Sequence, residues 1–237
     1  MTRRFTLIGP GRAGLSLHTV LGELGWECVA VCRRGDDIAH AARDVDLCVI
    51  ATPDAEISAV ASAIEPGHGV VMHLSGATPL SALGNHNEVA GLHPLQSLPN
   101  PTLGAASLYE CHFAVAGHRV AKQLAEAISG KWFPLSDSDR ALYHCAAAIA
   151  SNHTVALLGQ VQRLADSVGV PMEAFAPLVQ ASVANALAEG PGNALTGPAA
   201  RGDHVTIEAH RDALAAKHPD ELASYDALVE LAQRLSS

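Results

Sequence analysis

Aromatic residues, charged residues and long apolar runs are all scarce in this sequence of 237 residues. Phe, Trp and Tyr make up 4% of it and charged residues 16%, whereas apolar residues reach 49%, a fraction that excludes an intrinsically disordered chain. No stretch approaches the roughly 20 consecutive apolar residues of a membrane-spanning helix. The start, MTRRFTLIGPG, has too few apolar residues for a signal peptide. We therefore expect a globular cytoplasmic protein without a membrane partner.

Basic clusters and paired cysteines are also missing. The formal net charge is −9, and an acidic chain without a basic run repels phosphate backbones, which excludes nucleic acid as a partner. The five cysteines are odd in number and lack the C-x-x-C spacing, so we expect free thiols in a reducing compartment. Thirteen histidines are present, but none forms the H-E-x-x-H pattern, and we expect no metal site.

The first half of the chain alternates short apolar runs with helical stretches. Because the apolar runs are nearly continuous, they predict strands buried on both faces, as in a doubly wound, mostly parallel α/β sheet. The expected strands are Phe5–Gly9, Glu27–Cys32, Leu47–Ala51, Gly69–Leu74, Val89–Leu92, His112–Ala116 and Trp132–Leu135. The expected helices are Arg12–Gly25, Ile38–Arg43 and Glu56–Ile64, and residues 93–104, rich in proline and glycine, are expected to form a loop.

The second half is alanine-rich and predicts helices only. Residues 139–168 contain a single glycine and no proline, and we expect one long helix there. Three further helices are expected, at residues 171–189, 205–218 and 219–235, with a loop at residues 190–203. We therefore expect two domains, an α/β domain at residues 1–136 and an all-α domain at residues 137–237.

A glycine fingerprint, G-x-G-x-x-G, follows the first expected strand and opens the first expected helix. In a Rossmann domain the first glycine permits a tight turn, the second lets the backbone approach a pyrophosphate, and the third lets helix and strand pack closely. The helix N-terminus then offers free N–H groups to the anion. The pattern predicts a nicotinamide dinucleotide site that includes Gly9, Pro10, Gly11, Arg12, Ala13 and Gly14.

Two arginines at the end of the second expected strand indicate which dinucleotide binds. NAD-binding domains carry a carboxylate there for the ribose hydroxyls, whereas an arginine pairs with the 2′-phosphate of NADP. This chain has Arg33 and Arg34 at that point, so we expect NADP. The alternative is NAD, with the arginines on a solvated surface and Asp36 or Asp37 serving the ribose.

Small and hydroxylic residues follow the third and fourth expected strands, at the carboxyl ends where α/β sheets bind ligands. We expect Thr52, Pro53, Ser75 and Gly76 to contact the nicotinamide half of the cofactor. The alternative interpretation is ordinary turn chemistry.

Several segments resemble known proteins. GPGRAG, ATPD, HLSGA and GLHPLQSL are similar to the 6-phosphogluconate-dehydrogenase-like superfamily. The later segments YHCAAAIASNHTVALL and LTGPAARGDHVTIEAHRDAL resemble the Rossmann-like proteins with a DUF2520 domain, and the resemblance covers essentially the whole chain. It implies an NADP-dependent Rossmann domain followed by an all-helical domain through which two copies pair. A stripe of Tyr143 and small apolar residues on the long helix also suits helix packing in a homodimer.

The sequence departs from the superfamily at the proton donor. The hydroxyacid dehydrogenases and ketopantoate reductases of the superfamily carry a lysine in a K-x-x-x-N helix motif, but this chain has only Lys122, Lys131 and Lys217, none of them on the long helix. Histidines are natural donors near neutral pH. The candidate catalytic residues are His93, His144, Asn152 and His210, of which His144 and Asn152 share one helix face at α-helical spacing. The alternative is that each histidine fills space or caps a helix.

The candidate substrate-binding residues are Arg201 and Thr206. Arg201 could pair with a carboxylate or phosphate, and Thr206 faces the same way as His210 on the next helix. Asp203 between them suits a helix N-cap. We expect an NADP-dependent oxidoreductase that reduces a small carbonyl or imine compound, with 2-oxo acids among the candidates. The alternatives are a non-catalytic NADP(H) sensor and an oxidative enzyme like prephenate dehydrogenase.

Overall fold

The computed structural model describes residues 2–235. By its contacts the chain divides into two compact units, Met1–Ser151 and Asn152–Ser237. The first unit holds the sheet and its flanking helices, and the second is helical. The expected boundary between residues 136 and 137 lies just after the last strand of the sheet. That residues 1–136 and 137–237 are separate domains stays a prediction.

The first unit is built on a seven-stranded sheet with the order β2-β1-β3-β4-β5-β6-β7. The strands β1 to β5 run parallel, β6 pairs antiparallel with β5, and β7 pairs parallel with β6. This confirms the predicted mostly parallel α/β sheet. The strand bounds are β1 Arg4–Ile8, β2 Glu27–Cys32, β3 Leu47–Ile50, β4 Val70–His73, β5 Val89–Pro94, β6 Phe113–Gly117 and β7 Trp132–Pro134.

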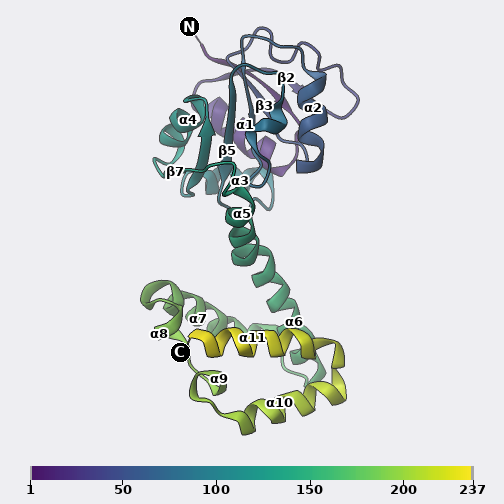
Figure 1. The fold of residues 1–237 in the computed structure, drawn as a ribbon, viewed down its shortest axis with the longest axis vertical. Helices are drawn as coiled ribbons and strands as arrows, with labels where there is room; N and C mark the ends of the chain where they lie inside the picture. Colours follow the sequence, from purple (N-terminus) through teal and green to yellow (C-terminus); the bar gives the residue numbers. More distant parts are fainter. Residues whose placement is uncertain (1, 236–237) are drawn as a thin grey trace. The chain divides into compact units, whose positions relative to one another are not determined.

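Helices cover both faces of this sheet (Figure 1). One apolar core joins the sheet to α1 (Arg12–Glu23), α3 (Pro101–Leu108) and α4 (Val120–Ile128). The opposite core joins it to α2 (Ile57–Ala63). The arrangement places the carboxyl ends of β1, β3, β4 and β5 along one edge of the sheet, where open α/β sheets bind ligands.

Strand β2 is less covered than its apolar sequence predicts. Val29 and Val31 are 43% and 37% exposed, so the expectation of burial on both faces is wrong for this edge strand. The helix expected at Ile38–Arg43 is also absent from the described chain, which forms only turns there. The backbone carbonyls of Ala39 and Ala42 accept hydrogen bonds from Glu65 N at 2.8 Å and from Gly69 N at 3.0 Å, so tertiary contacts take the place of α-helical bonds in this segment.

Helix α3 corrects the expectation of a loop over residues 93–104. It begins at Pro101, and the Asn100 side chain accepts a hydrogen bond from Leu103 N at 2.9 Å. Asparagine at the N-cap with proline at the first helical position is a helix-start signal. The proline and glycine content of the segment concealed it.

The long helix expected over residues 139–168 is interrupted. Helix α5 (Arg140–Ala148) is followed by a π-helical segment, Ile149–His153, and then by α6 (Thr154–Ser167). A π-helical turn changes the angular phase of the residues that follow it. The spacing argument that put His144 and Asn152 on one face assumed an unbroken α-helix, and it fails for this reason.

The second unit is helical, as predicted, with short helical turns inside the segment expected to be a loop. Asp203 caps α10 as expected, because its carboxylate accepts hydrogen bonds from Thr206 N at 3.1 Å and from the Thr206 hydroxyl at 2.8 Å. The bounds of the remaining helices are α7 Ala176–Glu189, α8 Pro191–Ala194, α9 Pro198–Arg201, α10 His204–Lys217 and α11 Leu222–Leu235. Within residues 2–235, no helix is both long and apolar enough to cross a bilayer.

Candidate functional site

The glycine loop between β1 and α1 has the geometry that a phosphate cradle needs. Gly9 has φ +88°, and a Cβ there would lie 2.8 Å from the backbone carbonyl of Ala51. A Cβ on Gly14 would lie 2.5 Å from Gly9 O and 3.0 Å from the Ala51 side chain. Both glycines are therefore required by the packing of the loop against β3.

Gly11 differs from its two neighbours in the fingerprint, because a Cβ there would meet no atom within 4 Å. It is the N-cap of α1, and no side chain caps that helix. The backbone at Gly11 is therefore accessible and lies beside the free N–H groups at the N-terminus of α1. A phosphate could bind at such a position. Pro10 lies in the same loop, Arg12 is exposed at the start of α1, and Ala13 packs partly into the core.

Arg33 and Arg34 both lie exposed after the end of β2. The Asp36 carboxylate turns back and accepts a hydrogen bond from Arg33 N at 2.7 Å. Asp37 accepts one from Ala39 N. Both carboxylates proposed as alternative ribose ligands therefore help to close the β2–β3 connection.

The predicted residues after β3 and β4 occupy different environments. Thr52 lies against the Gly9 turn, and its buried Oγ1 is one of three such side-chain atoms in residues 2–235 without a hydrogen-bond partner. Leaving a buried hydroxyl unpaired costs about 1–3 kcal/mol unless a ligand pairs with it. Pro53 is exposed at the start of the turn that follows. The Ser75 hydroxyl, in contrast, is bonded to the Thr78 hydroxyl at 2.9 Å and accepts from Thr78 N at 2.9 Å.

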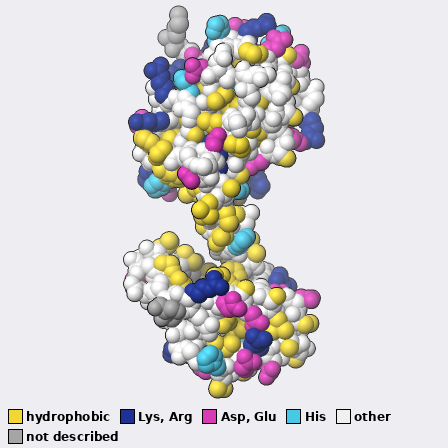
Figure 2. Space-filling view, in the orientation of Figure 1, with side chains coloured by type: hydrophobic (Ala, Val, Ile, Leu, Met, Phe, Trp, Pro, Cys, Tyr) yellow, Lys and Arg dark blue, Asp and Glu magenta, His cyan; other side chains and the backbone are white. Residues whose placement is uncertain are grey.

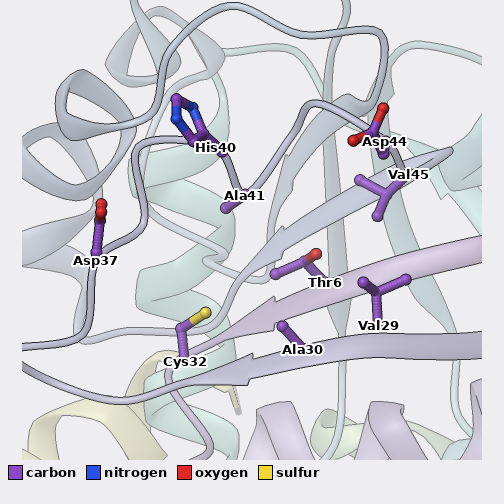
Figure 3. Close-up of a pocket in the computed structure, with 9 residues that line it drawn as sticks. All are labelled: Thr6, Val29, Ala30, Cys32, Asp37, His40, Ala41, Asp44 and Val45. Carbon is purple, nitrogen blue, oxygen red and sulfur yellow. The ribbon is translucent and has the colours of Figure 1, made fainter.

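A separate hollow of about 260 Å³ lies under the β2–β3 connection, where the expected helix does not form (Figure 3). Thr6, Cys32, Asp37 and His40 are among the residues that line it. None of the described lining residues belongs to the glycine loop. The hollow lies against strands β1 and β2, and its lining includes Cys32, the last residue of β2.

Three aromatic side chains gather where β5 meets α5. The Tyr143 hydroxyl lies 2.6 Å from His93 Nδ1, and the His93 and His144 rings are 6.1 Å apart. Gly76, after β4, touches the same group, because a Cβ there would lie 2.9 Å from His93 Cε1 and 3.0 Å from His144 Cδ2. The structure thus brings together the predicted residues Gly76, His93 and His144, and it adds Tyr143.

Burial controls the protonation of this aromatic cluster. Burial and, after it, the neighbouring His144 lower the pKa of His93 to about 4. Burial raises the pKa of Tyr143 to about 12. At neutral pH the imidazole is therefore uncharged, and the phenol retains its proton while hydrogen-bonded to a ring nitrogen. The Tyr143 phenol therefore holds a proton at neutral pH and lies within hydrogen-bond distance of His93 Nδ1.

An ion pair at the start of α5 holds the loop after β4 in place. Arg140, 2% exposed, donates from Nε to the Asp137 carboxylate at 2.7 Å and from a guanidinium NH to Ser75 O at 3.3 Å. Asp137 also accepts from Leu80 N at 2.9 Å. Although burial alone would raise it, these contacts lower the pKa of Asp137. The pair fixes the segment that carries Gly76 against the helix that carries Tyr143.

His73 is fully buried on β4 beside this ion pair. Its Nδ1 accepts a hydrogen bond from Ser75 N at 3.2 Å, and its Nε2 is buried without a partner. Burial and the nearby Arg140 charge lower the pKa of His73 to about 4. Among residues 2–235, no group of three His, Cys, Asp or Glu side chains is placed to hold a metal ion.

The remaining predicted residues lie in the second unit. Asn152 belongs to the π-helical segment, and His210 Nδ1 lies 2.9 Å from the Tyr225 hydroxyl. Arg201 is exposed at the end of α9, and the Thr206 hydroxyl is used in the cap of α10. The proposed roles of these four residues stay predictions.

Sequence reasoning missed Tyr143, Arg140 and His73. The helical spacing of Tyr143 with small apolar residues indicates a packing stripe, and histidine chemistry near neutral pH favours its neighbour His144. A usable signal was present, since Asp137 and Arg140 are three residues apart at a helix start, and His73 is a titratable residue inside an otherwise apolar strand.

Comparison with family models finds one match, to the domain of unknown function DUF2520, over residues 112–232. Comparison with curated proteins finds no match. The matched segment runs from β6 through the helical second unit, and it includes α5 with Tyr143 and His144.

Several solved structures share the fold along nearly the whole chain. A proposed NADP oxidoreductase of Bacteroides fragilis is 18% identical with a TM-score of 0.83, covering 98% of both chains. A Thermotoga maritima protein is 23% identical with a TM-score of 0.76, again over 98% of both. A reductive aminase from Aspergillus terreus, in complex with NADPH4, cyclohexanone and allyl amine, is 17% identical with a TM-score of 0.70, covering 99% of this chain and 93% of its own. At these identities the likeness establishes a common fold.

Proposed function

The chain belongs to the DUF2520 family, and on that premise we propose that it is an NADP(H)-dependent oxidoreductase that reduces a small carbonyl or imine compound. The observation that carries the proposal is the glycine loop, in which Gly9 and Gly14 have no room for a side chain while Gly11 is open. The loop is built to close on β3 and still leave bare backbone for a pyrophosphate.

The residues that would hold the cofactor lie along one edge of the sheet. The loop residues Gly9 to Gly14 would hold the pyrophosphate, and Arg33 and Arg34 would pair with a 2′-phosphate. Thr52 and Pro53 would lie toward the nicotinamide half, with Ser75 and Gly76 beyond them. The fold shared with the reductive aminase, which was solved with a nicotinamide cofactor, supports this placement. NAD stays the alternative cofactor.

Tyr143 and His93 would handle the proton. The bound cofactor would supply the hydride. Tyr143 would give its phenolic proton to the oxygen or nitrogen of the reduced double bond, and Nδ1–H of His93 would stabilise the phenolate by a hydrogen bond. The 2.6 Å contact between the two side chains supports this pairing, and it removes the need for the superfamily lysine.

The protonation states of His93 and Tyr143 indicate the kind of group that reacts. A neutral His93 and a neutral Tyr143 suit an uncharged carbonyl or imine group at the reacting end. Arg201 and Thr206 stay candidate substrate-binding residues, suited to a carboxylate or phosphate, and His144, Asn152 and His210 stay candidate catalytic residues. The cytoplasmic location also stays a prediction.

We further propose that the protein is a homodimer through its helical part. Only three apolar residues of the second unit are buried among those the structure describes, namely Ala165, Ile207 and Leu214. Larger apolar side chains are exposed on its helices, among them Val183 and Leu187. Figure 2 shows hydrophobic side chains on the surface of the helical part. With so few buried apolar residues, the second unit needs to bury more of its apolar surface. Packing against the helices of a second copy would supply that burial.

A nucleotide titration tests the proposed function. NADPH and NADH are titrated by fluorescence against the wild type and Arg33→Ala/Arg34→Ala, and the wild type is then assayed with small ketones, 2-oxo acids and cyclic imines. We expect NADPH to bind more tightly than NADH, the double variant to lose that preference, and NADPH oxidation to require a substrate. Binding of NADPH without turnover of any substrate class would favour the sensor, and binding of neither nucleotide would refute the proposal.

A further inference from the structure

Arg34 and Glu56 form an ion pair between the segments that follow two different strands. Arg34 lies just after β2, and Glu56 belongs to the short turn Asp54–Glu56 that follows β3. A guanidinium NH of Arg34 bonds to Glu56 Oε1. The strand order β2-β1-β3 places these two segments on either side of the β1–α1 glycine loop. The pair therefore joins the two flanks of the region that would hold the adenosine half of a dinucleotide.

The guanidinium in this pair is also one of the two groups proposed for the 2′-phosphate. The other group is Arg33, whose backbone N–H donates a hydrogen bond to the Asp36 carboxylate. Its side chain has no partner among the hydrogen bonds and ion pairs of the described residues. The 2′-phosphate and the Glu56 carboxylate would both bind the guanidinium of Arg34 through its N–H groups. Two anions at one guanidinium repel each other, so binding one weakens the other.

We propose that Glu56 weakens the preference for NADP(H) over NAD(H) by competing with the 2′-phosphate of NADP(H) for Arg34. This inference rests on the proposed function, since it concerns the same cofactor. NADH has no 2′-phosphate, so it leaves the Arg34–Glu56 pair intact. The carboxylate therefore lowers the affinity for NADPH and leaves the affinity for NADH unchanged.

The exposure of the two side chains permits this exchange. The Arg34 side chain is 83% exposed and that of Glu56 39%. An exposed pair of this kind is weak, so a phosphate can displace the carboxylate. Because the pair that NADPH must break is weak, removing the Glu56 charge should strengthen NADPH binding by only roughly twofold to fivefold.

The test compares Glu56→Gln with a matched control. Glu65 is another exposed carboxylate of the first unit, paired with Arg43 at 3.3 Å and His40 at 3.1 Å. Glu65→Gln removes the same charge without touching Arg34. By fluorescence titration in low salt, we expect Glu56→Gln to bind NADPH more tightly and NADH unchanged, and Glu65→Gln to match the wild type for both.

A second background shows whether Glu56 acts through Arg34. In Arg34→Ala, the further change Glu56→Gln should no longer strengthen NADPH binding, because there is no guanidinium to release. A gain that persists in full in that background would overturn the proposal, as would wild-type NADPH affinity in Glu56→Gln alone; the proposed function survives either result. Failure of the wild type and every variant to bind NADPH would overturn both.

Discussion

The hydroxyl of Tyr143 and Nδ1 of His93 lie 2.6 Å apart, although the two residues are 50 positions apart in the chain. His93 comes from β5 and Tyr143 from α5, so the contact joins the end of a strand to the side of a helix. It pairs an uncharged imidazole with a phenol that keeps its proton at neutral pH. From this pairing we expect Tyr143 to be the proton donor of the proposed reduction.

Replacing Tyr143 should abolish most turnover without affecting nucleotide binding. Tyr143→Phe removes the phenolic proton and keeps the ring, so we expect kcat to fall by about 10²–10⁴. The measurement is NADPH oxidation with the best substrate from the screen, alongside an NADPH titration. Tyr109→Phe is the matched control, because Tyr109 bonds to Glu23 at the surface of the same unit. Equal kcat in both variants would eliminate Tyr143 as the donor.

Local signals in the sequence were sufficient for the sheet and the glycine loop. Continuous apolar runs predict β1, β3 and β4 because each strand is buried on both faces, and this pattern is visible without any knowledge of neighbours. The glycine loop was predictable because Gly9 needs a positive φ and Gly14 needs bare backbone, both of which only glycine supplies.

The aromatic cluster was not predictable in the same way. Tyr143 reaches His93 only because α5 docks on the end of β5, and that contact is a matter of tertiary packing. The π-helical segment at Ile149–His153 leaves no mark in an alanine-rich stretch, so a continuous α-helical period was assumed across it. At Ile38–Arg43 tertiary hydrogen bonds from Glu65 N and Gly69 N to backbone carbonyls of the segment overrode a weak helical pattern.

Removing Arg140 should destabilise the first unit. Arg140→Met keeps the length of the side chain but loses its charged hydrogen bonds to Asp137 and Ser75 O, and we expect a loss of about 2–3 kcal/mol in the free energy of unfolding. Urea denaturation measures it. Arg43→Met, which breaks an exposed pair with Glu65, should change stability by less than about 1 kcal/mol. Equal losses in the two variants would show that the Arg140 pair contributes no more than a surface contact.

Stability should fall in mild acid because two histidines are buried uncharged. The pKa of both His73 and His93 is about 4 in the folded protein, against 6.5 for an ordinary histidine. The unfolded chain therefore binds more protons between these values, and the free energy of unfolding decreases as the pH falls from 6.5 to 4. Each histidine should contribute about 3 kcal/mol to that decrease.

Denaturation at several pH values measures this dependence. His73→Asn keeps an acceptor for Ser75 N but cannot titrate, so its stability should decline less steeply between pH 6.5 and 4. The exposed His68→Asn should decline as the wild type does. If His73→Asn declines as steeply as the wild type, His73 is not buried uncharged.

The exposed apolar side chains of α7 should control assembly. Val183 and Leu187 are four residues apart on one helix face and are 48% and 84% exposed. If a second copy covers them, Val183→Ser/Leu187→Ser should convert a dimer to a monomer in light scattering. Leu103→Ser, an equally simple change at an exposed leucine of α3, should leave the mass unchanged. A wild type that is monomeric at all concentrations would contradict the homodimer.

Two single-methyl substitutions in the glycine loop separate binding from folding. A Cβ on Gly14 would lie 2.5 Å from Gly9 O, so Gly14→Ala should cost about 2–3 kcal/mol of stability. A Cβ on Gly11 would meet nothing, and Gly11→Ala should cost less than about 1 kcal/mol as a weaker N-cap. The added methyl group nevertheless projects from the open backbone at which a pyrophosphate would bind.

We therefore expect Gly11→Ala to remain folded and to bind NADPH at least tenfold more weakly than the wild type. Thermal unfolding and fluorescence titration on the same preparations give both quantities. Gly22→Ala, at a helical glycine of α1 whose Cβ would also meet nothing within 4 Å, is the control for the methyl group itself and should bind NADPH normally. Wild-type NADPH affinity in Gly11→Ala would mean that the phosphate does not approach this loop, because a methyl group at the point of contact cannot be accommodated without displacing it.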